Sequence, residues 1–219
     1  MNDEPAGPMG DAVRALPMFP LGSVTLPGAA VPLHVFEPRY RALVQRCLST
    51  DRRFGSVLIE RGSEVGGGDV RCSIGAALTI VRAEPAPDGR WSVLAVATER
   101  VRVVEWLPDA PHPQAIVETQ PDAPADDRTN AALDAAQRAI TDWLDAATSL
   151  GLSVPSPVLP PLDDPVLASF RLVALSPLGP LDRQHLLEAD GPTARCTGLV
   201  EAMDGQVELL RARFGDGDD

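Results

Sequence analysis

The chain has 219 residues, 44% of them hydrophobic and only 4% aromatic, and it carries a formal net charge of −12 at pH 7. This length suffices for one large domain or two small domains with a buried core. The acidic charge opposes binding to nucleic-acid phosphates or anionic lipid, and no apolar run of about 18 residues predicts a transmembrane helix. Residues 1–13 are acidic, rich in Pro and Gly and unlike a secretion signal, so we expect a cytoplasmic protein with a disordered N-terminal segment.

Residues 16–46 consist of short apolar pieces followed by the start of a helix. An apolar strand is expected over residues 18–21, a second apolar piece ends at residues 27–28, and a third covers residues 31–36. Pro38 then begins a predicted helix, because the first helical position needs no N–H donor and suits proline.

The junction between the third apolar piece and this helix carries the first candidate functional residues. His34 followed by Glu37 suits a general base with a carboxylate that orients it. No nucleophile accompanies the pair, which favours a histidine that only completes a strand. Tyr40 is expected to pack on the sheet while Arg39 holds Glu37 or a carbonyl oxygen. The alternative is that Arg39 and Tyr40 border a groove that binds peptide.

The next part of the chain is predicted to form strands, because apolar residues alternate with a period of two. Asp88 and Gly89 are a typical hairpin turn. The glycines at residues 66–68 indicate a loop rather than an anion-binding nest, since no helix follows them. Short strands at this spacing indicate a small, strongly curved sheet or barrel. The expected strands cover residues 53–60, 74–81, 91–98, 100–104 and 114–119, with 91–98 and 100–104 forming a hairpin.

The C-terminal part of the chain is predicted to be helical and is the more acidic half. Residues 121–128 are polar, contain proline and are expected to be a linker. Thr129 is expected to cap the first helix and Gly151 to end it. Residues 121–219 hold 17 acidic residues and 7 arginines, against 14 and 12 in residues 1–120. The expected helices cover residues 129–150, 164–176, 180–189 and 193–213.

Several of these segments, in this order, resemble the N-terminal substrate-recognition domain of the ATP-dependent Lon proteases, which also occurs as stand-alone bacterial proteins. The resemblance begins with residues 16–46, continues with residues 74–81 and includes residues 164–174 and 181–189. It implies an α+β protein, with a PUA-like β pseudo-barrel over residues 14–120 and a C-terminal helical bundle over residues 129–214. One departure concerns Ala97 and Thr98, which stand where the family has a glycine before Glu99 and Arg100.

The same resemblance implies recognition rather than catalysis. All 19 basic residues are arginine, so the lysine of a Walker A loop and that of a Ser–Lys dyad are both missing from this sequence. Three cysteines and three histidines are scattered, which predicts no metal site, and no cofactor motif is present. We therefore expect a protein without enzymatic activity.

The expected function is recognition of protein partners or exposed apolar peptide segments in protein quality control, with a role as adaptor or regulator of an ATP-dependent protease. The alternative is a PUA-like protein that binds nucleic acid, which the charge opposes. The candidate residues for binding a peptide or partner are His34, Phe36, Glu37, Arg39, Tyr40, Arg61 and Arg100.

Overall fold

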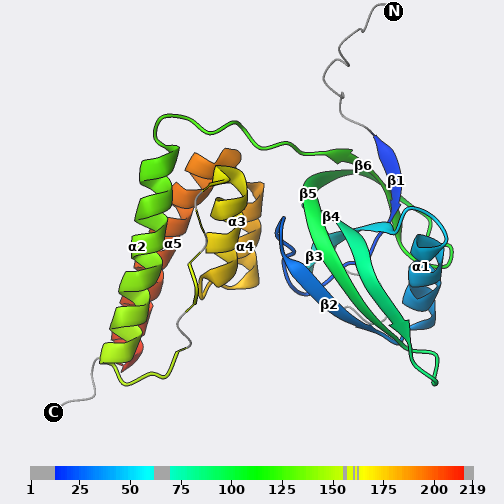
Figure 1. Cartoon of the computed structure of the whole chain (residues 1–219), viewed down its shortest axis with the longest axis horizontal. Coiled ribbons are helices and arrows are strands. Elements are labelled where there is room, and N and C mark those ends of the chain that lie inside the picture. The colour runs from blue at the N-terminus through cyan, green and yellow to red at the C-terminus, as the bar shows by residue number, and fades with distance from the viewer. Residues whose placement is uncertain (1–12, 62–69, 155–156, 160, 162, 215–219) are drawn as a thin grey trace, which may run out of the picture. The chain divides into compact units, whose positions relative to one another are not determined.

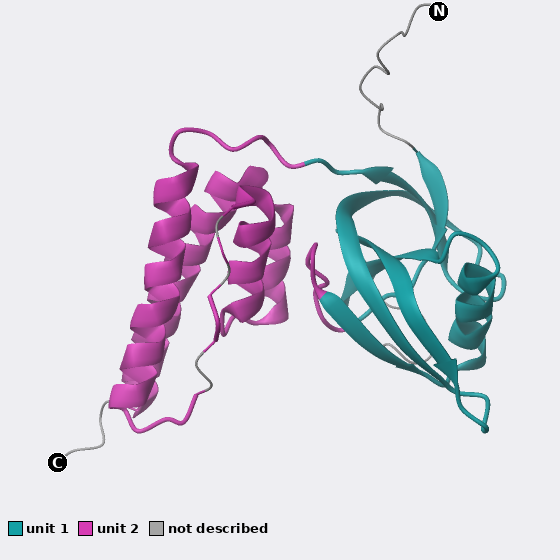
Figure 2. Cartoon of the chain, viewed as in Figure 1, with its two compact units in different colours: residues 1–21, 30–121 teal, residues 22–29, 122–219 magenta. Residues whose placement is uncertain are grey.

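A computed structural model describes residues 13–61, 70–154, 157–159, 161 and 163–214 (Figure 1). The predictions for residues 1–12 and for the glycines at 66–68 lie outside this range. The chain forms two compact units: unit 1 contains residues 1–21 and 30–121, and unit 2 contains residues 22–29 and 122–219 (Figure 2). No helix among the described residues is long and apolar enough to span a bilayer.

The described residues of unit 1 form six strands in antiparallel pairs and one helix. The strands pair in the order β1-β6-β5-β4-β3, and β2 pairs with the first part of β5. Pro38 begins helix α1, as the sequence predicts. The elements are β1 (Arg14–Pro17), β2 (Ala30–Val35), α1 (Pro38–Leu48), β3 (Arg53–Arg61), β4 (Val70–Pro85), β5 (Trp91–Leu107) and β6 (Gln114–Thr119).

The two ends of this strand order are joined by the residues that follow β1. Met18 and Leu21 form parallel bridges to Gly55 and Leu58 of β3. The backbone N–H of Phe19 donates to the Gly55 carbonyl at 2.7 Å. The sheet therefore closes on itself around apolar side chains, while β2 is off this strand path and pairs with β5.

Strand β5 differs from the predicted hairpin. Trp91–Leu107 is one continuous strand, so the prediction of two strands over 91–98 and 100–104 is wrong. The register with β4 shifts between Ala97 and Glu99, which leaves Thr98 as an extra residue, and its hydroxyl donates to the Ala77 carbonyl at 3.2 Å. This bulge bends the strand without the glycine that the family has nearby. The turn at Asp88 and Gly89 is confirmed, between β4 and β5.

Unit 2 contains helices α2 (Thr129–Ser149), α3 (Pro165–Leu175), α4 (Pro180–Glu188) and α5 (Gly191–Phe214). Thr129 does not cap α2, since the N-cap is Arg128 and the Thr129 hydroxyl accepts from the Asp126 N–H at 2.8 Å instead. Gly151 follows α2 with φ +74°, a left-handed conformation that suits glycine at a helix end. Residues 22–29 also belong to unit 2, and among them the Leu26 side chain is buried, with 3% exposed.

One buried arginine joins several parts of unit 2. The Arg195 side chain of α5 is fully buried, and its guanidinium donates to the Asp122 carboxylate and to the Ser169 hydroxyl at 2.7 Å. It also donates to the Leu186 carbonyl at 3.1 Å and lies 3.5 Å from the centre of the Phe170 ring. Residues of the segment before α2, of α3 and of α4 are thereby fixed to α5.

Candidate functional site

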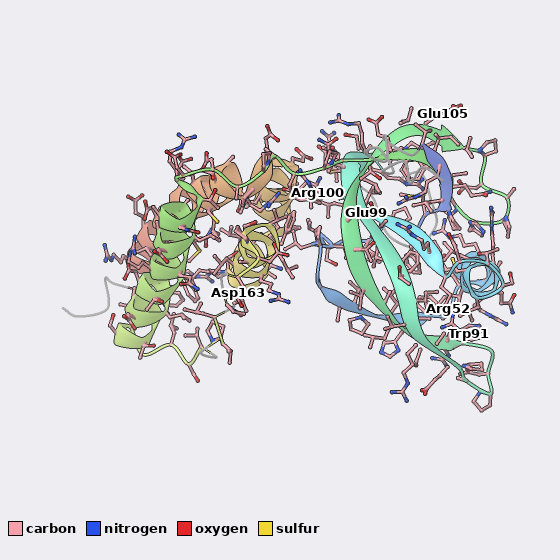
Figure 3. All side chains as sticks on the ribbon, turned by 45° about the horizontal axis from the view of Figure 1, so that its top comes forward. Arg52, Trp91, Glu99, Arg100, Glu105 and Asp163 are labelled. Carbon is pink, nitrogen blue, oxygen red and sulfur yellow. The ribbon has the colours of Figure 1, made fainter. Side chains whose placement is uncertain are left out.

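Five of the seven candidate residues lie in one continuous stretch, at the end of β2 and the start of α1. We call residues 30–40 the β2–α1 corner. Its strand is held against β5, with Val35 opposite Trp91 and Ala30 opposite Val96. Figure 3 shows Trp91 at the start of β5, whereas Glu99 and Arg100 lie farther along the same strand.

Within the corner, Tyr40 and Arg39 have well-defined structural contacts. The Tyr40 ring is 4% exposed and stacks on Phe19, with ring centres 4.0 Å apart. The Arg39 guanidinium lies 4.5 Å from the centre of the Tyr40 ring and donates to the Glu37 carboxylate at 3.0 Å. Tyr40 thus packs in the core of unit 1, and Arg39 connects that ring to the residue that precedes α1.

The side chains of His34 and Phe36, in contrast, project into solvent. Phe36 is 57% exposed although it is the largest apolar residue of the corner, and His34 is exposed on the outer face of β2. An exposed aromatic residue beside a rigid, paired framework is a suitable anchor for a partner, because it can be buried at little cost in backbone order. His34 and Phe36 are therefore the exposed candidate residues within the corner.

Arg61 and Arg100 lie outside the corner. Arg61 is exposed at the end of β3, opposite Val70. Arg100 is 2% exposed in the middle of β5, and its guanidinium donates to the Pro121 carbonyl at 2.9 Å. The Gln120 N–H donates in turn to the Arg100 carbonyl at 3.0 Å. Arg100 thus fixes residues 120–121, at the end of unit 1, to β5.

Sequence reasoning did not single out Pro32, which determines the hydrogen bonding of β2. Pro32 lies opposite Leu94 of β5 and has no N–H to donate, so this position must be a pair that exchanges no bonds with β5. Bonded and non-bonded pairs alternate along an antiparallel ladder, so Val31 and Leu33 bond to β5. The backbone groups of Ala30, Pro32 and His34 then point to the opposite edge. No other strand within the described residues pairs with that edge.

The two faces of β2 differ in the same alternating way. Ala30, Pro32 and His34 are exposed, whereas Val31 and Leu33 are only partly buried and pack against the hydrophobic core of unit 1. The core is therefore incompletely covered along the β2 edge. Leu94, opposite Pro32, adds a 36% exposed leucine to the outer face.

Two buried cysteines, Cys47 in unit 1 and Cys196 in unit 2, have raised thiol pKa values. Burial raises the pKa of the Cys47 thiol to about 12, with the Asp51 carboxylate adding to the effect, and burial raises the pKa of Cys196 to about 11. Both thiols are therefore protonated at neutral pH and poor nucleophiles. Among the described residues, no group of three His, Cys, Asp or Glu side chains could hold a metal ion. The corner thus presents the exposed Phe36 side chain beside a strand edge that pairs with no other strand among the described residues.

Comparisons with known proteins agree on one family. The sequence model of the ATP-dependent protease La (LON) substrate-binding domain matches residues 15–205. Lon protease 2 of Herpetosiphon aurantiacus is 27% identical over an alignment of 208 positions, which covers 89% of this chain and 24% of that protease. The chain thus spans about a quarter of that curated relative.

Two solved structures share the fold. A Lon N-terminal domain protein from Xanthomonas campestris is 28% identical, with a TM-score of 0.64, over 86% of this chain and 98% of that chain. The N-terminal domain of a Lon protease from the Mycobacterium avium complex has a TM-score of 0.63 at 17% identity, over 87% of this chain and 98% of that chain. The α+β fold, with an antiparallel sheet and five helices among the described residues, is therefore that of the Lon N-terminal domain.

Proposed function

The chain belongs to the family of LON substrate-binding domains, and we propose that it is a recognition module without enzymatic activity that binds other proteins through exposed apolar peptide segments. The observation that carries this proposal is the β2–α1 corner, where the exposed Phe36 adjoins the edge of β2. Both features belong to a framework fixed by the stacking of Tyr40 on Phe19. A rigid framework favours binding, because little order has to be gained when the partner arrives.

The absence of catalysis is part of the proposal. The sequence holds no lysine for the phosphates of ATP or for a Ser–Lys dyad. The buried thiols of Cys47 and Cys196 are held in their protonated form. A protein of this kind would act as an adaptor or regulator that presents clients to a separate ATP-dependent protease in the cytoplasm of a bacterium.

Two finer descriptions belong to the same proposal. Unit 1 would be a PUA-like pseudo-barrel, which the closure of its sheet through Met18 and Leu21 supports. Unit 2 would be a helical bundle around α5. A PUA-like fold allows binding to nucleic acid, but the net charge of −12 works against that function, since phosphate binding depends on an excess of positive charge.

The test is binding to a model protein in its unfolded and native forms. Reduced and carboxymethylated α-lactalbumin should bind the full chain, and native α-lactalbumin should not. Phe36→Ser should weaken this binding about fivefold or more, because a buried aromatic anchor contributes roughly 1–2 kcal/mol. Val104→Ser is the matched control, since Val104 is 56% exposed on the far part of β5. Equal binding of the two forms, or none of either, would contradict the proposal.

A further inference from the structure

We propose that the free edge of β2 binds an extended segment of another protein as an added antiparallel strand, with a register that Pro32 sets. This inference rests on the proposed function and specifies how the client is bound. Adding a strand to a sheet edge satisfies backbone groups of both chains, and the side chains between them provide selectivity.

The backbone of β2 supplies the first part of the argument. The register against β5 and the missing N–H of Pro32 together direct the N–H groups of Ala30 and His34 to the free edge. The carbonyl groups of Ala30, Pro32 and His34 point the same way. An incoming antiparallel strand can therefore exchange bonds with Ala30 and with His34, and between them it can donate one bond to the Pro32 carbonyl.

Pro32 also determines which occupant the edge favours. A foreign strand loses a single hydrogen bond opposite Pro32. Two copies of this chain, paired edge to edge about a twofold axis, would lose one bond at the proline of each copy. Prolines on edge strands oppose pairing between copies of the same protein for this reason. The edge therefore favours a segment from a different protein over a second copy.

The side chains of β2 define the chemistry of that segment. Residues of the added strand that lie opposite Val31 and Leu33 point to the same face as these side chains. Val31 and Leu33 are partly exposed there and pack on the core of unit 1, so an apolar residue opposite each would complete the cover of the core. Residues opposite Ala30, Pro32 and His34 face solvent on the outer side and can be polar. The preferred client is an extended segment with alternating apolar and polar residues, as unfolded strands of β proteins have.

The test uses a fluorescein-labelled peptide, Lys-Thr-Val-Thr-Val-Thr-Lys, and the full chain, with fluorescence anisotropy as the measurement. In the proposed register the threonine N–H groups donate to β2 and the valine side chains cover Val31 and Leu33. Methylation of the three threonine amides should weaken binding about tenfold or more, because each blocked amide removes a hydrogen bond. Methylation of the two valine amides should change the affinity by less than about threefold, since those amides point away from β2.

A substitution in the protein tests the role of the proline. Pro32→Val restores the missing donor and should tighten binding of the unmethylated peptide about fivefold, the factor that corresponds to one neutral hydrogen bond. It should also promote self-association in sedimentation velocity, which the natural proline opposes. Pro108→Val is the control, because Pro108 is exposed beyond the end of β5 and should leave both measurements unchanged.

Five outcomes would overturn the inference. Equal effects of the two methylation patterns would show that β2 does not bind the peptide as a strand, and so would an unchanged affinity of Pro32→Val. Binding of unfolded α-lactalbumin without binding of the peptide would do the same, while the proposed function survives. A dimer of the natural chain that the peptide dissociates would assign the edge to a second copy. Failure of both the peptide and unfolded α-lactalbumin to bind would refute the proposed function as well.

Discussion

Polar groups are paired within the protein around Arg195 in unit 2, whereas backbone groups along the edge of β2 in unit 1 are left open. The Arg195 guanidinium is fully buried and is surrounded by the Asp122 carboxylate, the Ser169 hydroxyl and the Leu186 carbonyl. The edge of β2 instead leaves backbone donors without a strand partner among the described residues. Buried polar groups must be paired inside the protein. Backbone groups without a partner in the protein are tolerated only where water or a binding partner can reach them. Complete pairing around Arg195 is therefore typical of a structural site, whereas the open edge of β2 is where we propose that a partner binds.

The largest effect is expected when the complete network is broken. Arg195→Met should lower the free energy of unfolding of unit 2 by roughly 3–5 kcal/mol, because it leaves the Asp122 carboxylate and the Ser169 hydroxyl without their buried partner. Urea unfolding followed by circular dichroism at the helical band measures this change. Arg138→Met is the control, since Arg138 is exposed on α2, and it should change stability by less than about 0.5 kcal/mol. A loss below about 1 kcal/mol for Arg195→Met would mean that the network is not essential to unit 2.

A smaller, pH-dependent effect is expected where unit 2 pairs an exposed carboxylate. The Asp126 carboxylate accepts hydrogen bonds from the hydroxyl of Thr193 first of all, then from Arg128 and Thr129, and these lower its pKa from 3.8 to about 2. A carboxyl whose pKa is lowered by folding stabilises the folded state above its ordinary pKa, and this contribution is lost as the pH falls toward the lowered value.

Asp126→Asn should therefore be less stable than the natural chain at pH 7, and the difference should shrink as the pH falls from about 4 through about 2. Thermal unfolding at a series of pH values measures the difference. Asp134→Asn is a suitable control, because Asp134 is exposed on α2. A difference that persists unchanged down to pH 2 would show that the charge of Asp126 is not what stabilises the protein.

Much of the fold could be predicted from the sequence, because local patterns determine it. The period of two identified the strands around Asp88 and Gly89, and the proline at position 38 located the start of α1. The continuity of β5 was missed, since the Thr98 bulge depends on how β4 pairs with it rather than on a local glycine. The grouping of residues 22–29 with the helices has no local signal either, because it arises from packing between distant segments.

The candidate site was predictable only in part. The stretch from His34 to Tyr40 was identified, and so was the packing of Tyr40 on the sheet, but no local pattern indicated that the Phe36 side chain would be 57% exposed. Pro32 carried a usable signal, because a proline within a strand indicates an edge. Arg195 carried none, since its partners lie about 70 residues earlier at Asp122 and in two other helices.

The smallest perturbation, a hydrogen exchange measurement on the unmodified chain, examines the open edge directly. If Pro32 determines which residues of β2 bond to β5, the amides of Val31 and Leu33 are hydrogen-bonded to β5. These amides then exchange only when the sheet opens. The amides of Ala30 and His34 point to the free edge and should exchange at least about a hundredfold faster in the same strand. Residue-resolved nuclear magnetic resonance measures both rates. Slow exchange at Ala30 and His34 would mean that the edge is already occupied. The backbone groups of β2 would then be as fully paired as the side chain of Arg195. Fast exchange at these two amides, followed by their selective protection when the threonine–valine peptide binds, would identify the open edge as the surface that the family framework presents to its clients.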